Sequence, residues 1–98
     1  MHYYVYIIES LVDGSFYKGF TLDFNERIKQ HNEGWSNYTS RKIPWKLVHL
    51  EIYATKAEAL KREVAVKKYS HKQIESLRKS PKNCLNKLAE RNPQSLGD

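Results

Sequence analysis

The stretch YYVYIIESLVDGSFYKGF, residues 3–20, decides the fold, and the rest of the chain is arranged around it. Its first part, residues 2–9, is rich in Tyr, Val and Ile, which favour β-strands. A period of two puts Tyr4, Tyr6 and Ile8 on one face, and the alternate positions again carry Tyr, Val and Ile. Since both faces are apolar or aromatic, the pattern predicts a central strand covered on both sides.

A turn signal at Asp13-Gly14 divides the stretch, and residues 15–20 return as a second strand, forming a hairpin. The length of the loop decides which residues face each other. A two-residue loop leaves Tyr6 several positions from direct pairing with Tyr17, whereas a longer loop brings the two opposite each other. The sequence leaves both registers open.

A helix over residues 24–32 follows, opened by Asp23 with Glu26 three positions later, the pattern of a capping box. At 100° per residue, Arg27 and His31 share one face with the two apolar residues of this helix. An inward arginine needs a carboxylate, a backbone carbonyl or a ligand phosphate as its partner, unless it lies along the edge of the core.

The remaining elements complete an α+β domain. Residues 34–44 read as a polar loop beside the site, residues 45–53 as a third strand and residues 56–69 as a second helix. Ser70 opens a third helix, and Pro81 starts a last one. We therefore predict an α/β (α+β) fold, with a small, mainly antiparallel three-stranded sheet flanked by helices.

The chain of 98 residues is short enough for one domain, which we place at residues 1–91, with a frayed tail at 92–98. Its single cysteine, Cys84, excludes an internal disulfide. No apolar run approaches the roughly 18 residues that a membrane helix needs. These features predict a cytoplasmic protein with no membrane partner.

Positive charge is concentrated in the second part of the chain, and the net charge is +6. Residues 1–40 hold three Lys or Arg against five Asp or Glu, whereas residues 41–98 hold fourteen against six. Such an imbalance indicates a polyanionic partner or a solubilising surface. No base-reading pattern accompanies the charge, so weak sequence preference is expected of any nucleic-acid binding.

One acid lies among the apolar positions of the second helix. We assign Leu60 and Val64 of this helix to the core, and Glu63 falls inside the same arc. A bare buried carboxylate is costly and needs compensation. Two partners are open at this point: Lys67 at i+4, as an ordinary ion pair, and a divalent metal.

The order and spacing of these residues resemble the GIY-YIG nuclease domain over about residues 3–78. Tyr4-Val5-Tyr6 stands where that family has Gly-Ile-Tyr, and Tyr17-Lys18-Gly19 where it has Tyr-Ile-Gly. Arg27 follows Tyr17 by ten residues, as the helix arginine of the family does, and His31 matches a histidine of many members. Glu63 stands where the family has its metal-binding glutamate. The resemblance is strongest to small stand-alone bacterial members.

The resemblance implies a metal-dependent endonuclease that hydrolyses DNA phosphodiester bonds, in repair or recombination, on branched or damaged DNA. It implies one Mg²⁺ or Mn²⁺ ion at Glu63 and a phosphate held by Arg27. Tyr6, Tyr17 and His31 are candidates for accepting the proton of the attacking water, and nearby cations would lower a phenol pKa toward that task. Predicted nucleic-acid contacts are Lys18, Arg41, Lys42, Lys67 and Lys68. The late asparagine of the family is assigned to Asn86, with Asn83 as the rival.

Two other functions remain open from the sequence. A nucleic-acid-binding module on the same scaffold would bind in a salt-sensitive way and cleave poorly. A structural or protein-interaction domain would use Arg27 and the Glu63–Lys67 pair only as ion pairs, and it would bind polyanions weakly.

Overall fold

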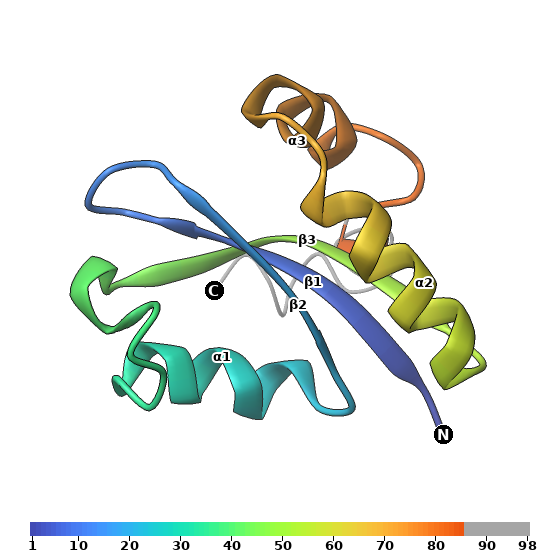
Figure 1. Ribbon diagram of the computed structural model, residues 1–98, viewed down its shortest axis with the longest axis horizontal. Helices are drawn as coiled ribbons and strands as arrows, with labels where there is room; N and C mark the ends of the chain where they lie inside the picture. Colours follow the sequence, from blue (N-terminus) through green and yellow to red (C-terminus); the bar gives the residue numbers. More distant parts are fainter. Residues whose placement is uncertain (86–98) are drawn as a thin grey trace, which may run out of the picture.

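The computed structural model describes residues 1–85, which form a three-stranded sheet with helices on both of its faces (Figure 1). The predicted α+β fold is therefore confirmed, and the predicted elements over these residues appear within two residues of their expected bounds. Along the chain the elements are β1 (Tyr3–Ser10), β2 (Phe16–Thr21), α1 (Phe24–Asn32), the 3₁₀ helix η1 (Ser40–Lys42), β3 (Trp45–Tyr53), α2 (Lys56–Lys67) and α3 (His71–Arg78).

The sheet has the order β2-β1-β3, and both pairings are antiparallel. In the hairpin Glu9 pairs with Phe16, so the loop spans residues 11–15 and Tyr6 lies opposite Gly19. This register is neither of the two that the sequence left open. It makes Tyr17 a diagonal neighbour of Tyr6 on the same face, within reach of a large aromatic ring.

The central strand β1 divides the core into two layers, as its alternating pattern predicts. Val5 and Ile7 pack in the layer covered by α2 and α3, whereas Tyr6 and Ile8 pack in the layer covered by α1. Figure 1 shows α1 on one side of the sheet and the other two helices on the opposite side. Because β1 contributes to both layers, it fixes the position of every element that carries a candidate site residue.

The boundaries of α1 follow from its caps. The Asp23 side chain accepts a hydrogen bond from the backbone N–H of Glu26, which satisfies one of the free donors at the start of the helix. At the other end Gly34 adopts a φ of +83°, a left-handed conformation that glycine adopts without a side-chain clash. The helix therefore begins and ends where the sequence predicts.

The inward face of α2 differs from the prediction. Leu60 and Val64, assigned to the core, are exposed by 37% and 55%, while Ala59 and Val66 are the buried apolar residues. Arg62 lies on the inward side because its guanidinium pairs with a carboxylate of β3. The helix thus packs with Arg62 inward, while Leu60 and Val64 lie toward solvent.

The side chain of Asn83 forms hydrogen bonds with the backbone at the outer edge of β3. Its side-chain NH₂ donates to the carbonyls of Val48 (3.0 Å) and Arg78 (2.9 Å), and its oxygen accepts from the N–H groups of Leu50 (3.2 Å) and Leu85 (3.1 Å). The amide thus takes the place of a neighbouring strand at an edge that would otherwise be open.

Two further predictions fall partly or wholly beyond this region. Asn86 and the tail lie outside the described residues, as does most of the predicted last helix. Within the described part, no helix is long and apolar enough to cross a membrane.

Candidate active site

The phenol of Tyr6 lies across the backbone of its partner Gly19 on the edge strand β2. A Cβ at Gly19 would stand 2.5 Å from Cζ of Tyr6 and 2.8 Å from Cε1, closer than real Cβ atoms approach. Glycine is therefore required here by the tyrosine ring and not by backbone conformation, since no positive φ is involved. The last residue of the Tyr17-Lys18-Gly19 motif thus makes room for the Tyr6 ring, which ends at the edge of the sheet.

His31 joins this phenol to the loop after α1. The hydroxyl of Tyr6 lies 2.9 Å from Nε2 of His31, and the hydroxyl of Thr39 lies 2.8 Å from Nδ1. All three residues are buried. The helix face predicted from the sequence does carry His31 inward, where both of its ring nitrogens have partners.

Tyr17 lies beside this group but keeps an open side. Its ring is 4.9 Å from that of His31 and 6.4 Å from that of Tyr6, measured between centroids. Two adjoining cavities of about 490 and 260 Å³ open over it, and the ring of the exposed Tyr38 lies 5.9 Å away. Lys18 and Lys67 line the larger cavity. Tyr17 is therefore the phenol of the pair that a ligand in these cavities can touch.

Arg27 is half-buried on α1, and its Nη1 donates to Oε1 of Gln30 at 3.1 Å. Its guanidinium opposes the rise that burial causes in the pKa of Tyr6, and it adds to the lowering that burial causes in the pKa of His31. The predicted pairing of Arg27 and His31 on one face of the helix is thus present. Of the partners considered from the sequence, no carboxylate forms an ion pair with Arg27 among the described residues.

Burial controls the protonation states of Tyr6 and His31. It raises the pKa of Tyr6 to about 12, because the loss of hydration outweighs the opposing effect of Arg27. Burial, followed by the charge of Arg27, lowers the pKa of His31 to about 4. The predicted lowering of the phenol pKa by a nearby cation is present for Tyr6, but burial outweighs it. Near neutral pH both side chains are uncharged.

Glu63 approaches the site from α2. Its side chain is 16% exposed, its Oε2 lies 3.6 Å from Nζ of Lys67, and its charge contributes to the raised pKa of Tyr6. The carboxylate thus acts electrostatically on Tyr6 and also forms the i+4 pair that the sequence offered as the alternative. A pair this long, to a lysine that is 56% exposed, is weak.

The donor set suits a metal that is held mainly by water and substrate. Within residues 1–85 no group of three or more His, Cys, Asp or Glu side chains is arranged to hold a metal ion. Mg²⁺ is commonly bound by one or two carboxylates together with water and phosphate oxygens, so Glu63 alone fits such a site. A preformed protein cage does not fit these residues.

The other residues predicted to contact nucleic acid lie in different places. Lys18 and Lys67 lie at the larger cavity, whereas Lys42 lines the smaller one and its ammonium is held by Asp13 at 3.1 Å. Arg41 and Lys68 are exposed and line neither cavity. Asn83, the rival to Asn86, belongs to the edge of β3.

A second polar cluster, which sequence reasoning missed, occupies the opposite face of the sheet. Glu51 is buried on β3 and accepts from Nε2 of His49 (2.7 Å), from Nε of Arg62 (2.9 Å) and from the hydroxyl of Tyr53. Arg62 also donates to the hydroxyl of Tyr69 at 3.2 Å. The spacing of 49, 51 and 53 on one strand, which puts all three on one face, was the available signal. Thr39 was missed as well, and its loop gave no comparable signal.

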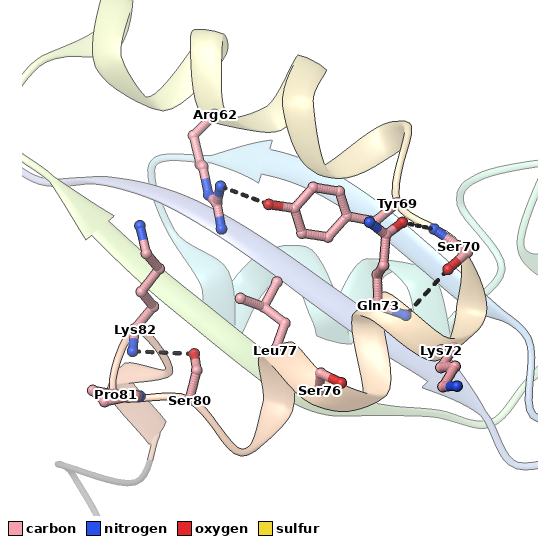
Figure 2. A pocket seen from close by; sticks show the side chains of 10 residues that line it. All are labelled: Arg62, Tyr69, Ser70, Lys72, Gln73, Ser76, Leu77, Ser80, Pro81 and Lys82. Carbon is pink, nitrogen blue, oxygen red and sulfur yellow. Dashed lines mark hydrogen bonds between the residues drawn. The ribbon is translucent and has the colours of Figure 1, made fainter.

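Figure 2 shows a larger cavity, of about 720 Å³, beside this second cluster. The bond from Arg62 to Tyr69 runs along one wall, and Leu77 and Lys82 line other parts of it. This cavity is not lined by any of the five predicted catalytic residues, Tyr6, Tyr17, Arg27, His31 and Glu63. Choosing the site by cavity volume would therefore point away from the tyrosine, histidine, arginine and glutamate residues predicted for catalysis.

Comparison with known proteins agrees with the motif and the geometry. The model of the GIY-YIG catalytic domain matches residues 2–76. UPF0213 proteins of Staphylococcus aureus, from strains Mu3 and Mu50 among others, are 45% identical over 69 residues, which is 69% of this chain and 83% of theirs.

A solved structure gives the same result. The solution NMR structure of the UPF0213 protein BH0048 from Bacillus halodurans is 41% identical, with a TM-score of 0.51 over 79% of this chain and 82% of that one. A match over most of the chain to a catalytic domain implies a nuclease type of function. The protein therefore belongs to the GIY-YIG catalytic domain family.

Proposed function

We propose that the protein is a divalent-metal-dependent endonuclease that hydrolyses phosphodiester bonds of DNA. The observation that carries this proposal is the meeting of Tyr6, Tyr17 and His31 at the Gly19 edge of the sheet, within the electrostatic reach of Arg27 and Glu63. These side chains come from two strands and two helices, and one of them, Tyr17, lines a cavity bordered by lysines.

Lys18 and Lys67 supply positive charge where a phosphate backbone would enter. Both line the cavity over Tyr17, and an ammonium is a suitable point charge for a phosphate oxygen. Arg27 acts electrostatically on Tyr6 and His31, and it would bind non-bridging phosphate oxygens while negative charge builds up. Weak sequence preference follows, because contacts of this kind do not read bases.

Tyr17 is the better candidate for the proton acceptor. It lines the cavities, whereas Tyr6 is buried and hydrogen-bonded to His31. A phenol accepts a proton only as phenolate or through a relay. Glu63 would hold Mg²⁺ or Mn²⁺ together with water and substrate oxygens, and such an ion, when bound, supplies Lewis-acid stabilisation of the phosphate charge.

The test is nicking of DNA by purified protein. Supercoiled, single-stranded and branched DNA would be incubated with Mn²⁺, with Mg²⁺ and with a chelator, beside the Glu63→Gln and Arg27→Ala variants. We expect metal-dependent nicking that both variants lose by about a hundredfold or more, since each removes an interaction with transition-state charge. Glu58→Gln is the matched control, because Glu58 is an exposed glutamate on the same helix.

A second function, binding of nucleic acid with little cleavage, is favoured by one observation. Glu63 forms a weak pair with Lys67, and the raised pKa of Tyr6 keeps its phenol protonated near neutral pH, where it cannot accept a proton. Salt-sensitive binding without nicking under either metal would favour this function over the nuclease.

A further inference from the structure

Three buried side chains form a continuous hydrogen-bonded row, Thr39–His31–Tyr6. The two separations, 2.8 Å and 2.9 Å, are within hydrogen-bond range, and each of the three residues is at most 1% exposed. A neutral imidazole has one N–H donor and one acceptor nitrogen. The direction of the bond at one ring nitrogen therefore fixes the direction at the other.

The hydroxyl of Thr39 has a single place to donate. Among the described residues, its only hydrogen-bond partner is Nδ1 of His31. Thr39 is the residue before η1, yet its side chain makes no bond to the backbone of that helix. A buried O–H left without an acceptor costs about 1–3 kcal/mol, and this cost applies to the hydroxyl of Thr39 as well as to that of Tyr6, so the two compete to donate to the one acceptor nitrogen of the neutral ring.

The backbone of Thr39 holds the hydroxyl in this position. Its carbonyl accepts from Nε1 of Trp45 at 2.9 Å and from the N–H of Lys42 at 3.1 Å, and its own N–H donates to Ser36 at 3.2 Å. These bonds do not involve the side chain. The side chain is thus free to act on His31 alone, and it can be altered without loss of the backbone bonds.

We propose that Thr39 is a positioning residue, which holds His31 as the tautomer with hydrogen on Nε2 and so makes His31 a donor to the oxygen of Tyr6. The hydrogen of the phenol then points away from His31 and needs another acceptor, such as a water or a substrate oxygen. Without Thr39 the phenol would donate to His31 and present only its oxygen. The relevance to catalysis rests on the nuclease function proposed above, whereas the tautomer itself does not.

The charge state of His31 agrees with this assignment. Burial and the charge of Arg27 lower the pKa of His31 to about 4, so the ring is neutral near pH 7. A neutral ring between two hydroxyls requires one to donate and the other to accept, which is the situation that the Thr39 hydroxyl resolves.

The test is the tautomer of His31, read from two-bond ¹H–¹⁵N correlation spectra of uniformly labelled protein at pH 7. We expect Nδ1 in the range of an unprotonated nitrogen and Nε2 in that of a protonated one. In Thr39→Val, which keeps the shape and removes the hydroxyl, the two resonances should move toward each other or exchange ranges. Thr39→Ser should restore the wild-type pattern. The exposed His2 and His71 serve as internal references.

Two results would overturn the proposal: a wild-type His31 protonated on Nδ1, or a folded Thr39→Val protein with the wild-type tautomer. The wild-type spectrum decides the first even if the valine variant does not fold. In the nicking assay, Thr39→Val should lower kcat about five- to tenfold at unchanged KM for DNA, and serine should rescue it. Absence of nicking in the wild type would refute the nuclease function but leave the tautomer result standing.

Discussion

Gly19→Ala is the substitution that tests the site geometry most directly. One added methyl group would stand 2.5 Å from Cζ of Tyr6, so the ring must move and its bond to His31 must break or lengthen. Overpacking of this kind costs about 1–3 kcal/mol, and the lost hydrogen bond adds about 1 kcal/mol. Alanine regains about 0.5–1 kcal/mol through the lower entropy of the unfolded chain. We therefore expect a net loss of about 1–3 kcal/mol in the free energy of unfolding.

Urea denaturation with an unchanged m-value measures this loss, and the ¹⁵N resonances of His31 report the movement of Tyr6. Gly14→Ala is the matched control: the residue has a φ of +75° with open space around it, so alanine is strained there but touches nothing. That variant should lose about 1 kcal/mol with His31 unchanged. In a Tyr6→Leu background, Gly19→Ala should cost much less. A stable Gly19→Ala protein with wild-type His31 resonances would refute the reasoning.

The remaining predictions concern groups on both faces of the sheet. Burial alone would raise the pKa of Glu51, but the hydrogen bonds from its neighbours outweigh it and lower the pKa from 4.5 to about 2. The stabilisation is therefore complete above about pH 4.5 and lost as the pH falls toward 2, and Glu51→Gln should flatten this acid limb in thermal melts. Asn83→Ala should lower the free energy of unfolding, measured by urea denaturation, by about 2–4 kcal/mol, because buried backbone groups of β3 lose their partners. A decrease below about 0.5 kcal/mol would contradict the role of Asn83 at the strand edge. Lys67→Ala should reduce the salt dependence of DNA binding by about one unit of log–log slope, whereas Lys82→Ala, at the distant cavity, should leave it unchanged if only the site near Tyr17 contacts DNA.

Strong local patterns made most of the fold predictable. The alternating residues of β1 identify a strand covered on both faces, and Asp23 and Gly34 mark the two ends of a helix and its cap. Those signals depend on neighbours in the sequence. The hairpin register was not predictable, because it depends on how five loop residues close between Ser10 and Phe16.

The candidate site was predictable in its members but not in its contacts. The spacing of Tyr6, Tyr17 and His31 indicated residues that the structure does bring together. Thr39 was not predictable, since a threonine in a polar loop carries no periodic signal, and its function depends on a bond to a residue eight positions away. The net rise in the pKa of Tyr6 was not predictable either, because the burial that outweighs the effect of Arg27 is a property of the packed molecule.

The two polar clusters are connected through α2. Of its inward residues only Ala59 and Val66 are buried and apolar, which is too little to fix how the helix is rotated. Arg62 supplies that constraint, since its guanidinium holds Glu51 with Nε at 2.9 Å and Nη2 at 3.2 Å. Glu63 is the next residue of the same helix, so a rotation of α2 that broke the pair between Arg62 and Glu51 would also move the carboxylate of Glu63. The second cluster and the proposed metal site are thus linked through the orientation of one helix.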